Sequence, residues 1–187
     1  MRRLLVRLVR DQRGYSLMEL IISMSILASV MTSVSVLLVS ATNTEVDMNR
    51  RFQAQTEARL GLDLMRREVH CAMSVTPVGA SSSVTLTIPA TCPTSGGNTS
   101  ITWCTVANGT DRWGLWRYPG SSCNVGTGRR FADYLTASSI FVYTGQTVDK
   151  LAFLNVRLPV NLKPSETRFL YNLEDDIVLR NSTRTAP

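Results

Sequence analysis

A long apolar run near the N-terminus constrains this chain more than any other feature. From Leu20 through Thr44 there is no charged residue, no proline and no glycine. A helix needs about 20 mainly apolar residues to cross the hydrocarbon core of a bilayer. The run therefore predicts a membrane-spanning helix. The remainder of the 187 residues is long enough for one external domain of modest size.

Most of the positive charge lies before this run. The formal net charge is +6, but residues 1–14 hold five arginines against one aspartate, a net of +4, which leaves +2 for the rest. Basic residues before a first apolar segment hold that flank in the cytoplasm, so the chain after Thr44 is expected to be exported. Because residues 15–187 are nearly neutral overall, their charge argues against nucleic acid as a partner. A local basic strip would not show in this net charge.

Four cysteines lie in the part expected outside the membrane: Cys71, Cys92, Cys104 and Cys123. They are even in number and lack the close C-x-x-C spacing of zinc sites, so they predict two disulfides. Three pairings are possible, and the sequence does not select one. We favour Cys71 with Cys92 and Cys104 with Cys123 because each pair closes a local loop.

One carboxylate stands at the start of the apolar segment. Glu19 follows the stretch Arg13-Gly14-Tyr15-Ser16-Leu17-Met18. An acidic side chain near the centre of a bilayer costs about 2.5 to 3.5 kcal/mol on insertion scales, so its presence needs an explanation. The simplest one places Glu19 at a helix end, near the headgroups and the positive end of the helix dipole.

The neighbourhood of Glu19 suggests more than that. A basic leader, Gly14, aromatic Tyr15, Glu19 five places after Gly14 and a long apolar helix resemble the class III signal of type IV prepilins and pseudopilins. The resemblance implies that a prepilin peptidase cuts between Gly14 and Tyr15 and methylates the new amine. It also implies that Glu19 meets the terminal amine of a neighbouring subunit in a filament, where a low dielectric penalises an unpaired charge.

The chain departs from that pattern in two places. Tyr15 stands where most members of the family have Phe, and no proline appears in the later half of the apolar helix. Many major pilins carry such a proline, which breaks or kinks a helix. An unbroken helix is therefore less typical of a major pilin.

Ordinary secretion is the competing interpretation of the N-terminus. Val39-Ser40-Ala41 would serve as a signal-peptidase site and release a soluble protein that begins at Thr42. Against this, the run from Leu20 to Val39 is longer than the usual apolar core of a signal peptide, about 7 to 15 residues.

The helix is expected to continue beyond the apolar segment as far as about Met73. No glycine or proline intervenes before Gly61, which is expected to allow a bend or a close contact with a sheet. Apolar residues recur at helical spacing and would form the spine of the external domain: Ala54, Ala58, Leu62, Met65 and Val69. The expected divisions are a cleaved leader at 1–14, a membrane or filament-core helix at 15–44, an amphipathic helix at 45–73 and a β-rich domain at 74–187.

Short β-rich runs separated by turn residues follow from Val75 onward. Strands are expected at 84–88, 101–106, 113–118, 140–143, 151–160, 169–171 and 177–179, and a short helix at 130–137. Asn108-Gly109 predicts a hairpin between the second and third strands. The predicted fold class is α+β, with the long helix packed on an antiparallel sheet. Residues 64–69, 116–118 and 178–181 resemble the PilW or J-type branch of minor pilins and pseudopilins.

The domain shows little chemistry. His70 is the only histidine, so neither a multi-histidine metal site nor a Ser, His, Asp set can form without it, and we interpret it as structural. Residues 174–176 are acidic and are expected to form a solvated turn rather than a calcium site. Trp103, Trp113 and Trp116 could form an aromatic binding face, but 113 and 116 fall on opposite faces of one strand, so at least one is expected in the core.

These features predict a non-enzymatic minor pilin or pseudopilin with no cofactor and no metal. Its expected partners are other pilins, the prepilin peptidase and, before assembly, the cytoplasmic membrane, with the C-terminal domain outside. The alternative is a monomeric anchored or secreted binding domain, for instance a disulfide-bonded adhesin. The sequence does not decide whether a pilus, type II secretion, DNA uptake or adhesion is served.

Overall fold

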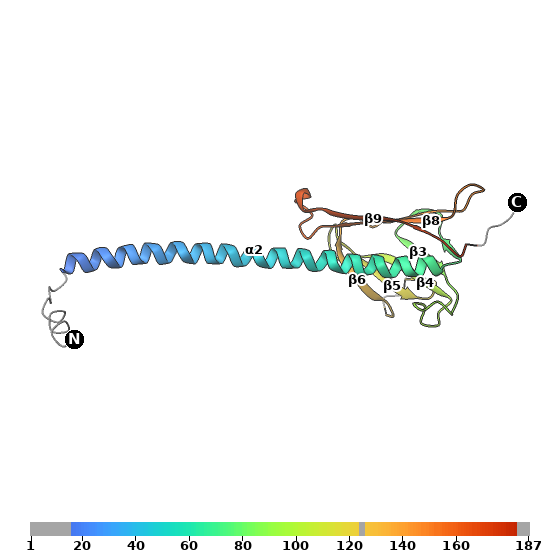
Figure 1. Cartoon of the computed structure of the whole chain (residues 1–187), viewed down its shortest axis with the longest axis horizontal. Coiled ribbons are helices and arrows are strands. Elements are labelled where there is room, and N and C mark those ends of the chain that lie inside the picture. The colour runs from blue at the N-terminus through green and yellow to red at the C-terminus, as the bar shows by residue number, and fades with distance from the viewer. Residues whose placement is uncertain (1–15, 124–125, 183–187) are drawn as a thin grey trace, which may run out of the picture. The chain divides into compact units, whose positions relative to one another are not determined.

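A computed structural model describes residues 16–123 and 126–182 of the chain. The described residues fall into two compact units, divided between Met48 and Asn49, and the second is called the unit at 49–187. One helix, α2 (Leu17–Cys71), contributes to both units and is followed by a curled antiparallel sheet (Figure 1). The fold is therefore α+β, as the sequence predicts, and it is consistent with the pilin fold.

Helix α2 contains 55 residues. Leu, Met, Arg, Ala and Glu, which favour helix, recur along it, and its one glycine is Gly61. The helix ends two residues before the expected Met73. There the backbone N–H of Met73 donates to Thr87 O at 2.8 Å, so the chain leaves the helix to enter the sheet.

Within the described residues the sheet has nine strands, all paired antiparallel, in the order β1-β3-β4-β5-β6-β8-β7-β2. Strand β9 lies off this path and pairs with β8. In chain order they are β1 (Ser74–Thr76), β2 (Gly79–Ser81), β3 (Ser83–Thr87), β4 (Ser100–Ala107), β5 (Trp113–Pro119), β6 (Arg129–Leu135), β7 (Phe141–Thr144), β8 (Phe153–Val160) and β9 (Tyr171–Val178). A 3-10 helix, η1 (Thr167–Phe169), precedes β9. The expected hairpin at Asn108-Gly109 is confirmed as the β4–β5 pair.

The short helix expected at 130–137 is wrong, because this segment is strand β6. Its backbone pairs with β5, where Leu115 lies opposite Ala132 and Trp116 opposite Arg130. The segment buries Ala132 and Leu135, and the sheet supplies the backbone partners that a helix would have supplied locally.

The acidic run 174–176 is also not a turn, because it lies inside β9. Its charges are compatible with a strand because alternate side chains find different partners. Asp175 pairs with Arg66 of α2 at 2.8 Å. Glu174 and Asp176 both accept hydrogen bonds from the Asn155 amide of β8, at 3.2 and 2.8 Å.

The core of the unit at 49–187 lies between α2 and the sheet. The predicted apolar stripe is confirmed, since Ala54, Ala58, Leu62, Met65 and Val69 are all buried. Gly61 belongs to the same face, and an added Cβ would lie 3.2 Å from Phe131 Cβ and 3.4 Å from Leu115 Cδ2. The glycine therefore permits the close contact with the sheet that the sequence suggested.

Polar side chains of α2 hold β9 against the helix. Arg59 Nη2 donates to Tyr171 Oη at 2.8 Å, in addition to the ion pair of Arg66. His70 Nδ1 lies 3.0 Å from Val178 O. A carbonyl only accepts, so this nitrogen carries the proton. In Figure 1, β9 and strands β4 to β6 flank the helix on different sides.

Candidate functional site

The candidate assembly site lies at the N-terminus of α2. Gly14 and Tyr15 fall outside the described residues, whereas Ser16 and Glu19 are described. The backbone N–H groups of Glu19 and Leu20 donate to Ser16 O at 2.9 and 3.1 Å, which closes the first turn of the helix. Glu19 lies in this turn, and its side chain is exposed. A carboxylate there gains from the positive end of the helix dipole.

The helix that follows exposes apolar side chains on every side. Large examples are Leu17, Ile21, Leu27, Met31 and Leu37, of which Leu17 is 77% and Leu37 70% exposed. By length and composition α2 is the one helix of the described residues that could cross a membrane. A helix that is apolar all round is normally surrounded by lipid or by other protein.

The hydroxyl groups in this apolar segment find hydrogen-bond partners within the helix itself. Eight of them donate to backbone carbonyls three or four residues earlier, at 2.8 to 3.0 Å: those of Ser23, Ser25, Ser29, Thr32, Ser33, Ser35, Thr42 and Thr44. Donors satisfied within the helix can enter hydrocarbon without an outside partner. Glu19 is then the only ionisable side chain between residues 16 and 44.

Residues 9–35 match the family model of the prokaryotic N-terminal methylation motif. The match supports a type IV pilin-like protein. It spans Gly14, Tyr15, Glu19 and the apolar run as far as Ser35. A search of curated proteins and a search of solved structures each find no match. The motif is one of structural subunits rather than enzymes, and it supports a membrane anchor with the C-terminal domain outside.

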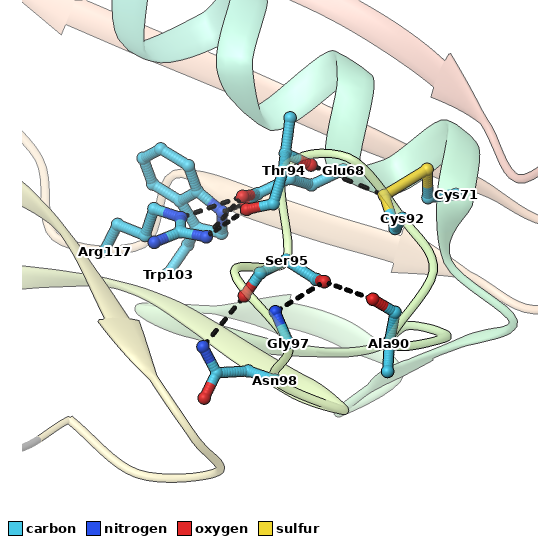
Figure 2. Close-up of polar contacts among 10 residues, drawn as sticks. All are labelled: Glu68, Cys71, Ala90, Cys92, Thr94, Ser95, Gly97, Asn98, Trp103 and Arg117. Carbon is cyan, nitrogen blue, oxygen red and sulfur yellow. Dashed lines mark hydrogen bonds and ion pairs between the residues drawn. A yellow bond between two sulfur atoms is a disulfide. The ribbon is translucent and has the colours of Figure 1, made fainter.

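The cysteines form two disulfides in the local pairing that the sequence analysis favoured. Cys71, the last residue of α2, pairs with Cys92, and Cys104 of β4 pairs with Cys123. The first bond ties the segment between β3 and β4 to the end of the helix (Figure 2). The Asn181 amide also donates to Cys71 O at 3.1 Å.

A buried polar cluster that sequence reasoning missed lies beside this disulfide (Figure 2). Glu68 of α2 is fully buried. Its Oε1 lies 2.8 Å from Arg117 Nε and 2.7 Å from Arg117 Nη2, and its Oε2 accepts from Trp103 Nε1 at 2.7 Å. Arg117 Nη2 also donates to Thr94 O at 2.9 Å.

Burial raises the pKa of the Glu68 carboxyl, and the hydrogen bonds and charge of Arg117, together with the Trp103 bond, oppose that shift. The sequence held one signal of this cluster. Glu68 is a charged residue directly beside Val69 of the buried stripe, and Arg117 stands among the apolar and aromatic residues of β5. The cluster joins helix, sheet and loop, so it is structural.

The other candidates from the sequence are His70, the acidic residues 174–176 and three tryptophans. Among the described residues, no group of three or more His, Cys, Asp or Glu side chains could hold a metal ion. Trp103 is fully buried. At least one of Trp113 and Trp116 was expected in the core, and neither is fully buried. Trp113 packs against the core, while Trp116 is half-buried.

Proposed function

We propose that this chain is a minor pilin or pseudopilin that assembles through α2 into a type IV pilus-like or type II secretion-like filament, or primes one. The observation that carries the proposal is the carboxylate of Glu19 in the first turn of α2, inside the methylation motif, where residues 20–44 carry no charge. Removal of residues 1–14 would leave Tyr15 as the first residue. Methylation of its amine keeps the positive charge.

The charge of Glu19 gives this helix a preferred register among its neighbours. When apolar helices pack together, a carboxylate without a partner costs several kcal/mol. The amine of an adjoining subunit would remove that cost only when the two helices are correctly displaced along their axes. Because cleavage creates the amine, assembly would depend on processing.

Two further features support this function over that of a major pilin or a secreted protein. Helix α2 runs from Leu17 to Cys71 and contains no proline, the residue that most often kinks a helix. The apolar segment also continues directly into the buried stripe of the unit at 49–187. Cleavage after Ala41 would cut this helix in its interior.

The first experiment determines the mature N-terminus. The full chain is expressed in a bacterium with and without its prepilin peptidase, and the purified protein is analysed by mass spectrometry. A chain that begins with methylated Tyr15 only when the peptidase is present is expected. Recovery of the intact leader, or of a chain that begins at Thr42, would contradict the proposal.

The second experiment tests Glu19 itself. Glu19→Gln should leave processing and membrane insertion unchanged, but should lower the amount of the chain in sheared filaments at least about tenfold, since loss of even 1.4 kcal/mol of pairing has that effect. Glu45→Gln, another exposed acid of the same helix, is the matched control and should assemble normally. Equal incorporation of both variants would refute the role of Glu19.

A further inference from the structure

The face of β5 and β6 that points away from the helix carries an aromatic and polar cluster. Trp103 lies opposite Arg117 in the β4–β5 pair, and both reach Glu68, so this face is the one that meets α2. Successive residues of a strand alternate between faces, so Trp116 points to the other face. Arg130 lies opposite Trp116 and shares that outer face.

The indole of Trp116 lies against Gly114 of its own strand. A Cβ added at Gly114 would come within 3.0 Å of Trp116 Nε1 and 3.5 Å of its Cδ1. The absence of a side chain at Gly114 is therefore what lets the ring fold back over the backbone. The residue is half-buried, so part of the ring stays open to solvent. Tyr118 stacks beside it, with ring centroids 6.1 Å apart.

A network of hydrogen bonds centres on Asp133 and includes Arg130, the register partner of Trp116. The Asp133 carboxylate accepts from the Asn108 amide at 3.0 and 3.1 Å, from Arg130 Nη1 at 3.1 Å and from the Tyr134 N–H at 2.9 Å. Gly114 lies close to both the ring and β6. A Cβ added at Gly114 would lie 3.4 Å from the backbone oxygen of Ala132, the residue before Asp133.

The backbone around the network is unusual. The register between β5 and β6 shifts twice, between Trp113 and Leu115 and again between Leu115 and Trp116. Asp111 and Tyr134 adopt positive φ angles of 52° and 62°. Each such residue costs about 1 to 3 kcal/mol, and β-bulges commonly redirect side chains at binding sites. Strain of this kind is concentrated at functional sites.

Several hydrogen-bonding groups of the cluster remain available. Within the described part of the chain, no hydrogen bond uses Trp116 Nε1, Arg130 Nη2 or Asn108 Oδ1. The site therefore offers two kinds of donor and one acceptor at the rim of a flat apolar surface. The charges of Arg130 and Asp133 cancel. A polyanion binds through an excess of positive charge, which this site lacks.

We propose that the outer-face cluster of Trp116, Arg130, Asp133 and Asn108 binds a neutral saccharide. A pyranose ring has an apolar face of C–H groups that stacks on an indole, and a rim of hydroxyls that both donate and accept hydrogen bonds. Trp116 supplies the stacking surface, Arg130 and Asn108 supply the rim contacts, and Asp133 holds both in place. This binding does not depend on the filament function.

Saccharide binding can be measured on the full chain in dodecylphosphocholine, a detergent without a sugar headgroup. The probes are maltotriose, cellotriose, chitotriose, mannotriose and lactose, with tryptophan fluorescence and saturation-transfer NMR as readouts. At least one probe is expected to bind with a Kd of about 1 mM or tighter. Trp116→Ala and Arg130→Gln should each weaken it at least about tenfold.

Arg157→Gln, which alters an exposed arginine of β8, is the matched control and should bind normally. Circular dichroism and the masses of both disulfide-linked peptides report whether each variant is folded. If Trp116→Ala does not fold, Arg130→Gln decides the question, because its side chain is 52% exposed. The proposal is overturned if no probe binds, if both variants bind normally, or if a thymidine oligonucleotide binds at the cluster in preference to every sugar.

Discussion

Removing the positive partner of Glu68 should destabilise the unit at 49–187 more than any change to an exposed ion pair. Arg117→Met deletes the guanidinium that contacts Glu68 Oε1 at 2.7 and 2.8 Å and leaves the carboxylate with Trp103 alone. A buried carboxylate without its counter-charge is destabilising by about 3 to 5 kcal/mol.

Protonation limits that cost. The ordinary pKa of the carboxyl is 4.5, which lies about 2.5 pH units below pH 7, and each unit corresponds to about 1.36 kcal/mol. A Glu68 that takes up a proton in the folded state therefore costs at most about 3.4 kcal/mol at pH 7. We expect Arg117→Met to lower the free energy of unfolding by about 3 kcal/mol at this pH.

The pH dependence follows from the direction of the pKa shift. The folded-state pKa of Glu68 is raised above its unfolded value of 4.5, so the folded state binds the proton more tightly. The stability gained from this tighter proton binding by Glu68 is complete below pH 4.5 and is lost as the pH rises through the folded-state pKa. Without Arg117 the folded-state pKa rises further, and the cost of the substitution should shrink as the solution is acidified towards pH 4.5.

The assay is guanidinium unfolding of the full chain in detergent micelles, followed by tryptophan fluorescence, between pH 4.5 and 7. Glu68→Gln combined with Arg117→Met should be more stable than Arg117→Met alone, because no buried charge remains. Arg66→Met is the control, since Arg66 is 44% exposed and such pairs contribute less than about 1 kcal/mol. The reasoning is refuted if Arg117→Met costs no more than this control, or if its cost grows on acidification.

Two further substitutions test how the helix end and the helix–sheet contact are held. Gly61→Val should lower the free energy of unfolding by about 1 to 3 kcal/mol because the new side chain meets Phe131. Gly61→Ala should cost less, because the helix propensity of alanine offsets part of the crowding. Equal melting temperatures of the two variants would contradict this. The double substitution Cys71→Ala, Cys92→Ala opens a loop with a sequence separation of 21. It should lower the free energy of unfolding by about 3 kcal/mol. A loss below about 1 kcal/mol in guanidinium unfolding would count against that value.

The long helix could be predicted from the sequence because its signal is local. Helical spacing of Ala58, Leu62, Met65 and Val69 requires a single buried face, and the structure buries all four residues. The β4–β5 hairpin was predictable for the same reason, since its two strands are joined by a recognisable turn at Asn108.

The errors concern segments whose structure depends on distant partners. The residues of β6 are acceptable in a helix, and only pairing with β5 makes them a strand. The acidic residues of β9 suggested a turn because their partners, Arg66 and Asn155, lie 109 and about 20 positions away. No local pattern contains that information.

The candidate sites also differ in whether a local sequence pattern reveals them. Glu19 was found because an isolated charge in an apolar run is visible in the sequence. Glu68 was missed because it lies among other charged residues of α2, and only the fold shows that it is buried. The network of Asp133 was missed because it depends on the register shifts between β5 and β6.

Glu19 and Glu68 lie in one helix and face the same physical requirement, which is that a carboxylate removed from water must have a positive partner. Within the chain, the fold supplies Arg117 to Glu68. No such partner is found for Glu19 in the described residues, and the apolar side chains around it are exposed. If Glu19 is to leave water as a charged carboxylate, its positive partner has to come from outside the described residues. A filament neighbour with a free N-terminal amine meets this requirement, and a helix that carried glutamine at position 19 would not need one.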